Sequence, residues 1–118
     1  MRLATLAGAA TVLAGAAGAE TLALYAASPD ECGTYAESTL SPDRFFAGGE
    51  GGSLALVDPR PVPGLDATLY EGAAVNEGAP VRIGTVLVVR EHDEDGARVV
   101  RVFTASEAMQ ERTVCPAG

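Results

Sequence analysis

Two stretches near the C-terminal end carry the pattern of apolar and polar residues expected of paired β-strands. Val81–Arg90 and Arg98–Thr104 are rich in β-branched residues and alternate with polar residues at their ends. Between them, Glu91–Gly96 supplies polar turn residues and a glycine that tolerates positive φ, so the sequence predicts a β-hairpin. The unbroken apolar run Val86–Val89 indicates cover on both faces of the strand, which favours a small barrel or a two-layer β-sandwich.

Three shorter stretches alternate in the same way and are predicted strands. They are Thr21–Ala27, Ser53–Asp58 and Asp66–Glu71. The glycine-rich segment 47–53 is expected to be a loop, either a plain linker or a mobile segment that orders over a ligand. Pro59–Gly64 contains three prolines without amide donors, so we expect an extended segment that takes no part in a strand ladder.

Helix start signals predict one or two short helices. Ser28-Pro29-Asp30-Glu31 has the form of a capping box and predicts a helix over about 29–39. Ser41–Phe46 repeats the signal more weakly and predicts one helical turn ending at Gly48. Ser106 is the expected cap of a helix over Glu107–Arg112. The predicted fold class is therefore mainly β with one or two short helices.

The first nineteen residues predict a cleaved signal peptide. Arg2 precedes an uncharged run from Leu3 to Ala17, and Ala17-Gly18-Ala19 has the small-x-small form that signal peptidase requires. A transmembrane helix is the alternative, but the run is short and rich in Ala and Gly. Residues 1–19 are thus interpreted as the signal peptide and 20–118 as one small exported domain, either periplasmic or secreted. The many Ala, Gly, Pro and Arg residues are typical of a GC-rich bacterial genome.

The remaining domain contains two cysteines, Cys32 and Cys115. An even number of cysteines in a small exported domain favours a disulfide. They are too far apart for a C-x-x-C redox motif, and with one histidine they cannot complete a tetrahedral zinc site without several carboxylates. We expect them to form a structural disulfide that joins the two ends of the domain.

Without Arg2 the domain has seven arginines, no lysine and 16 acidic residues, a net charge of −9. Nucleic acid and anionic membranes attract basic surfaces, so we expect no nucleic-acid binding and no stable membrane insertion after cleavage. A protein partner, for example a basic one, is compatible with this charge. The sequence carries no phosphate-binding or dinucleotide-binding motif, so no cofactor is expected, and it leaves the oligomeric state open.

Candidate chemistry is sparse. The sole histidine, His92, lies in the acidic hairpin turn, and Gly51–Ala55 lacks the second glycine of a nucleophile elbow. We therefore expect no catalytic residues and no enzyme activity. Asp93 and Asp95 alternate as calcium ligands do, but the closing glutamate of a calcium loop is absent. A solvated hairpin tip is the preferred interpretation of this segment, and a weak metal site involving His92, Asp93 and Asp95 is the alternative.

The adjacent pair Phe45 and Phe46 cannot turn both rings toward one core, so one ring is a candidate anchor for a partner. Together with Arg60 of the proline-rich strip, these are the candidate partner-binding residues. The sequence thus favours an exported, non-enzymatic binding domain. The alternatives are an inhibitor of a basic envelope or extracellular hydrolase and, less favoured, a weak metal-binding protein.

Overall fold

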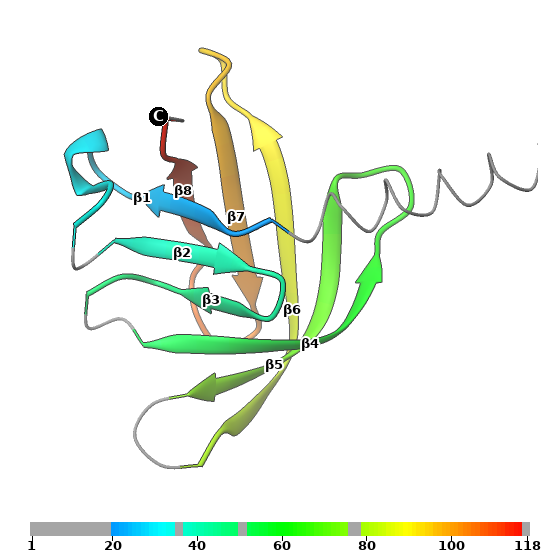
Figure 1. The fold of residues 1–118 in the computed structure, drawn as a ribbon. Coiled ribbons are helices and arrows are strands. Elements are labelled where there is room, and N and C mark those ends of the chain that lie inside the picture. The colour runs from blue at the N-terminus through cyan, green and yellow to red at the C-terminus, as the bar shows by residue number, and fades with distance from the viewer. Residues whose placement is uncertain (1–19, 35–36, 50–51, 76–78, 117–118) are drawn as a thin grey trace, which may run out of the picture.

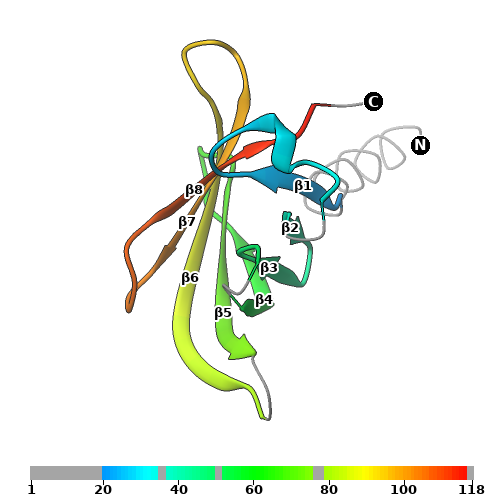
Figure 2. The same ribbon diagram turned by 90° about the vertical axis from the view of Figure 1, so that its left-hand side faces the viewer.

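The computed structural model describes residues 20–34, 37–49, 52–75 and 79–116. The predicted signal peptide, residues 1–19, lies outside them, and so do Tyr35 and Ala36 of the predicted first helix. The described part of the chain forms a closed barrel of eight antiparallel strands (Figures 1 and 2). The strands are β1 (Leu22–Tyr25), β2 (Ser38–Ser41), β3 (Arg44–Phe46), β4 (Ser53–Pro61), β5 (Ala67–Val75), β6 (Val81–His92), β7 (Arg98–Thr104) and β8 (Gln110–Val114).

Each strand pairs with the next one along the chain, and the barrel closes where β8 pairs with β1. At this closure Leu24 lies opposite Val114, and Tyr25 lies opposite Thr113. The predicted β-rich fold is confirmed, and of its two forms the structure adopts the barrel. Closure suits so small a chain because every strand then has a neighbour on both sides over at least part of its length, which leaves little unpaired sheet edge.

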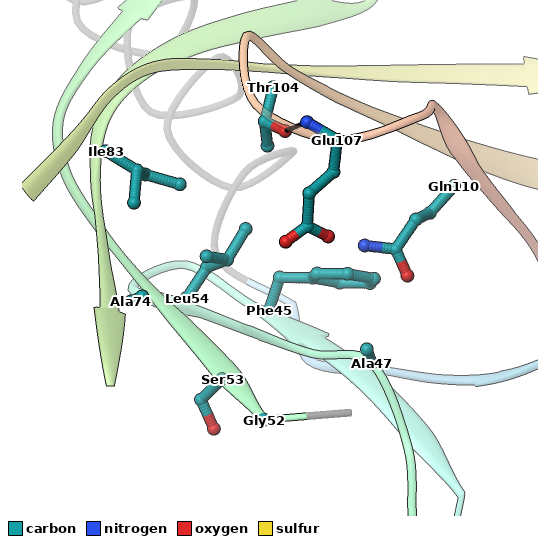
Figure 3. Close-up of a pocket in the computed structure, with 10 residues that line it drawn as sticks. All are labelled: Phe45, Ala47, Gly52, Ser53, Leu54, Ala74, Ile83, Thr104, Glu107 and Gln110. Carbon is teal, nitrogen blue, oxygen red and sulfur yellow. Dashed lines mark hydrogen bonds between the residues drawn. The ribbon is translucent and has the colours of Figure 1, made fainter. Parts of the chain in front are cut away.

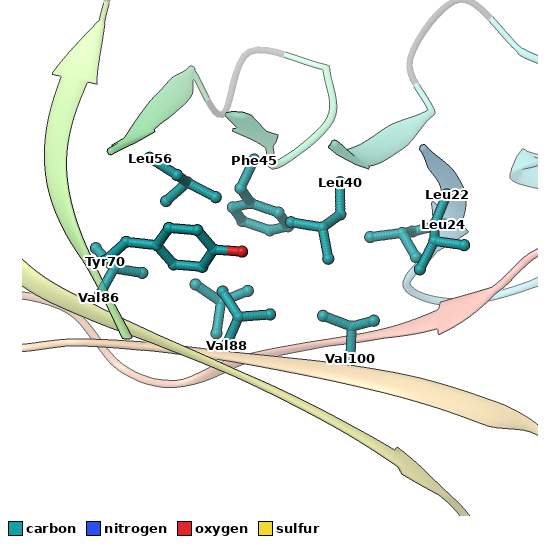
Figure 4. Packing of buried hydrophobic residues seen from close by; sticks show 10 residues of the cluster. Leu22, Leu24, Leu40, Phe45, Leu56, Tyr70, Val86, Val88 and Val100 are labelled. Atoms are coloured by element: carbon teal, nitrogen blue, oxygen red, sulfur yellow. The ribbon is translucent and has the colours of Figure 1, made fainter. Parts of the chain in front are cut away.

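Side chains from β1 to β7 fill the interior (Figure 4), and the part-buried Val114 of β8 packs against them. An eight-stranded barrel is just wide enough for such filling. The buried cluster comprises Leu22, Leu24, Leu40, Phe45, Leu56, Tyr70, Val86, Val88, Val100 and Val102. Within the predicted apolar run, Val86 and Val88 point inward and are 0% exposed, whereas Leu87 and Val89 are half-buried. Side chains on the inner face of β6 are therefore fully buried, whereas those on the outer face are only half-buried, because solvent reaches the outside of the barrel.

The predicted β6–β7 hairpin is confirmed, and its tip projects beyond the barrel (Figure 1). Gly96 has φ of 85°, the positive value that the turn requires. The Asp93 carboxylate accepts hydrogen bonds from the amides of Asp95 and Ala97, at 2.9 and 3.0 Å. These bonds hold the turn in one conformation.

The prediction of a helix over 29–39 is wrong beyond its first turn. Ser28 does cap a 3₁₀ turn, η1 (Pro29–Glu31), and its hydroxyl accepts a hydrogen bond from the Asp30 amide. Glu31, however, accepts hydrogen bonds from the amides of Ala26 and Ala27 and so closes the turn onto the end of β1. Gly33 then takes φ of 79°, which ends helical geometry.

The predicted helical turn ending at Gly48 and the predicted helix over Glu107–Arg112 are also wrong. The segment after Ser41 makes a tight turn at Pro42 and Asp43 into β3, so Arg44–Phe46 is a strand. Near the C-terminus, Gln110–Val114 is strand β8, which closes the barrel. In both places pairing with neighbouring strands outweighs a local helix start signal.

The proline-rich strip is extended, as predicted, but the expectation that it stays out of the ladder is wrong. Strand β4 continues to Pro61, with Arg60 opposite Leu69 and Pro61 opposite Thr68. The prolines are tolerated because β3 pairs only with Ser53–Ala55, so one side of β4 beyond that point needs no donors.

The predicted disulfide between Cys32 and Cys115 is present, with the Cα atoms 5.9 Å apart. It fastens the turn after β1 to the end of β8, beside the closure of the barrel, and it suggests an oxidising, extracytoplasmic environment. Among the residues described, no helix has the length and apolar character needed to cross a membrane.

Candidate functional site

The barrel interior offers little space for a ligand. At the end where β7 leads into β8, a cavity of about 110 Å³ lies between Phe45, Glu107 and Gln110 (Figure 3). The Glu107 amide donates a hydrogen bond to the Thr104 hydroxyl, so the β7–β8 connection folds over this opening. Pockets that hold small molecules usually have about 300–1,000 Å³. A binding site must therefore be sought mainly on the outer surface.

Arg112 of β8 is part-buried and joins β8 to the β2–β3 hairpin; it lines a second depression, of about 240 Å³, together with Ser38 and Ala47. Its Nε donates to the Ser38 hydroxyl at 3.2 Å, and its Nη2 donates to the Ala47 carbonyl and to the Gln110 side chain, both at 3.1 Å. The Ser38 hydroxyl in turn donates to the Phe46 carbonyl. Because these acceptors come from segments far apart in sequence, Arg112 acts first as a structural clamp.

The hairpin tip contains the candidate metal ligands, and their geometry favours a structural role. One oxygen of Asp93 already accepts two backbone hydrogen bonds, and His92 is exposed at the end of β6. Within the described ranges, no group of three or more His, Cys, Asp or Glu side chains is arranged to hold a metal ion. The tip exposes two further acidic side chains, Glu94 and Asp95, on this hydrogen-bonded turn.

A second surface is defined by strand register on the outside of β3–β6. Arg44, Ala55, Ala73 and Arg82 form one row across these four strands, because each lies opposite the next. Their neighbours Phe45, Leu54 and Leu56 belong to the core or pack against it, so the row faces outward. We call this surface the arginine face; it consists of Arg44, Ala55, Val57, Arg60, Glu71, Ala73 and Arg82.

Two β-bulges build the arginine face. Between Val57 and Arg60, β4 has one residue more than its partner strand, and Asp58 takes φ of 55° there. Without this extra residue the period-two alternation would turn Arg60 inward. A second bulge, at Ile83 of β6, does the same for Arg82. Each bulge thus moves one arginine from the core side to the outer side.

Arg60 and Arg82 both form ion pairs with the carboxylate of Glu71, which lies on β5 between their strands. Nη2 of Arg82 lies 3.1 Å from one carboxylate oxygen, and Nη2 of Arg60 lies 3.6 Å from the other. The Arg82 side chain is 81% exposed and the Arg60 side chain is 57% exposed, so both guanidinium groups are accessible. Arg82 and Glu71, but not Arg60, line a depression of about 180 Å³ on this face. Its other lining residues are Ala55, Val57, Asp58, Gly72 and Ala73.

The structure separates the three residues proposed as a partner site. Phe45 fills the core and is 0% exposed, so its ring is not accessible. Phe46 is half-buried on the outer side of β3, and Arg60 lies on the arginine face. Sequence reasoning missed Arg44 and Arg82. The signals for the bulges were present, since Pro59 and Gly84 stand inside strands, where proline and glycine often mark a bulge.

The fold and this surface define a small disulfide-linked antiparallel β-barrel with a filled interior. No protein-family model, curated protein or solved structure matches the chain.

Proposed function

We propose that the chain is an exported, non-enzymatic binding domain that reaches the periplasm or the medium and contacts a protein partner through the arginine face. The filled interior supports this, because it leaves the outer surface as the main place for recognition. A closed, cross-linked barrel also holds that surface rigid, which reduces the entropy lost on binding.

One observation carries the proposal: the bulges bring Arg60 and Arg82 to the same outer face as an exposed apolar side chain, Val57. Val57 is 53% exposed, among the most exposed large apolar residues of the described chain. Arginine is enriched among the residues that dominate protein interfaces, and an exposed apolar neighbour adds surface to bury. The sole histidine lies elsewhere, at the hairpin end of β6, whereas Arg82 lies near the other end of that strand.

Affinity capture from envelope extract tests the proposal. The bait is the domain from Glu20 onward, compared with the variant Val57→Ser/Arg60→Ala. The matched control is Met109→Ser/Arg98→Ala, which also removes one exposed apolar residue and one ion-paired arginine; Met109 is 44% exposed, and the Arg98 side chain is 46% exposed. We expect a specific partner that the control retains and the test variant loses. Equal capture by both variants would count against the arginine face.

The hairpin tip favours a second candidate, an inhibitor of a basic envelope or extracellular hydrolase. Glu94 and Asp95 sit on a turn fixed by Asp93, so their charges can be presented to a basic cleft without ordering cost. Association with such an enzyme should slow as salt rises. Glu94→Gln/Asp95→Asn should slow it more than Asp30→Asn/Glu107→Gln, which changes the net charge equally. An association rate independent of salt would exclude this candidate.

A further inference from the structure

The two ion pairs of Glu71 show what chemistry the arginine face accepts. The two guanidinium groups converge on one carboxylate, 3.1 and 3.6 Å from its oxygens, although they belong to strands on opposite sides of β5. Each guanidinium has five N–H donors, of which these contacts occupy one nitrogen each. Donors therefore remain for a second anion that lies close to Glu71.

The balance of charge on this face differs from that of the whole domain. The arginine face has three arginines (Arg44, Arg60 and Arg82) against one carboxylate (Glu71), in a domain whose net charge is −9. Of these charged groups only Arg82 and Glu71 line the depression, together with the neighbouring Asp58. At physiological ionic strength the screening length is about 8 Å, so a bound group experiences mainly these near charges. The face can hold a single negative charge that the rest of the molecule would repel.

The depression beside the arginines sets the size and character of that group. It measures about 180 Å³, and Ala55, Ala73 and Val57 give it an apolar floor and margin. A phosphate with two negative charges would lie against Glu71 and Asp58 and be repelled by both. A carboxylate carries one charge, matches the planar guanidinium fork, and brings methylene groups that suit the alanine floor.

We infer that the depression lined by Arg82 and Glu71 receives one carboxylate side chain, a glutamate or aspartate, from the protein partner, which competes with Glu71 for Arg82 and Arg60. This inference rests on the proposed function, because it names the group by which the arginine face recognises its partner. Glu71 holds the two arginines in position when the partner is absent and gives up part of its ion pairing when the partner binds.

Nuclear magnetic resonance of the Nε–Hε groups of Arg60 and Arg82 tests the inference without knowledge of the partner. The probe is N-acetylglutamate N-methylamide in 0.15 M NaCl, and its glutamine analogue is the neutral control. We expect saturable shifts with the glutamate probe alone, in both Nε–Hε groups and in the backbone amides of Ala55 and Ala73, which line the depression. The two amide shifts should be lost in Arg60→Ala/Arg82→Ala and kept in Arg98→Ala. Glu71→Gln should bind the probe about three- to fivefold more tightly, the scale of one exposed ion pair.

Equal shifts with both probes, or no saturable binding in Glu71→Gln, would overturn the inference. Its failure is distinct from failure of the proposed function. If Val57→Ser/Arg60→Ala loses the captured partner while no carboxylate binds, the interface stands and the carboxylate is wrong. If the probe binds and capture is unaffected, the carboxylate site is not the partner site, which also contradicts the inference as stated.

Discussion

Removing the disulfide should destabilise the barrel mainly through the unfolded state. Cys32 and Cys115 are 83 residues apart in sequence, so the bond restricts almost the whole unfolded domain. Loop-closure entropy for such a separation amounts to about 4.5 kcal/mol, an upper guide. The Cα separation of 5.9 Å lies within the usual range, and the Cys115 amide also donates to the Ala23 carbonyl at 2.8 Å, so the barrel closure persists without the bond.

The variant Cys32→Ser/Cys115→Ser should therefore fold to the same barrel but lose about 2–4 kcal/mol of unfolding free energy. For a domain of this size the melting temperature should fall by about 10–25 °C, measured by circular dichroism or calorimetry. Its urea m-value should rise, because the unfolded chain exposes more surface. Reductant should lower the melting temperature of the wild type and leave the variant unchanged. A fall of only a few degrees, with an unchanged m-value, would refute the reasoning.

Three further predictions concern the cleavage site before Glu20, the close packing at Gly72 and the hydrogen bonds of Arg112. Mass spectrometry of the exported protein should show Glu20 at the amino terminus, and retention of residues 1–19 would contradict the predicted signal peptide. Gly72→Ala should cost about 1–3 kcal/mol in urea unfolding, because the new Cβ would lie 2.4 Å from Cγ2 of Val86; adding Val86→Ala should relieve the clash, so strictly additive losses would contradict this reading. Arg112→Met should cost about 1–3 kcal/mol by leaving the Ser38 hydroxyl and the Ala47 carbonyl without their donor, and unchanged stability in calorimetry would show that the clamp is dispensable.

The strands were predictable where alternation was strong, and the helices were not. Strand β1 follows from the alternation of Leu22 and Leu24, and the β6–β7 hairpin from its β-branched residues and polar turn. Within the apolar run 86–89 the sequence did not show that only Val86 and Val88 point inward. The incorrect helix predictions were based on cap signals at Ser28, Ser41 and Ser106. A cap stabilises a helix only if the residues beyond it can be buried on one helical face, and here they pair with neighbouring strands.

The arginine face was only partly predictable, because it depends on register. Arg60 was identified from the sequence. Its outward direction, and the ion pairs that Arg60 and Arg82 share with Glu71, depend on two bulges that shift the alternation. Phe45 and Phe46 show the same limit, since the sequence indicates that one ring leaves the core without showing which. The structure assigns Phe45 to the core and leaves Phe46 half-buried on the outer side.

Site-specific photocrosslinking in exporting cells tests the proposed binding face most directly. A photoreactive residue is placed in turn at Val57 on the arginine face, at Glu94 on the hairpin tip, and at Met109 on the β7–β8 connection; all three positions are exposed. The account predicts a specific crosslinked partner from position 57, none from position 109, and loss of the product when Arg60→Ala is added. A product from position 94 alone, or equal products from all three, would contradict the claim that the arginine face binds the partner.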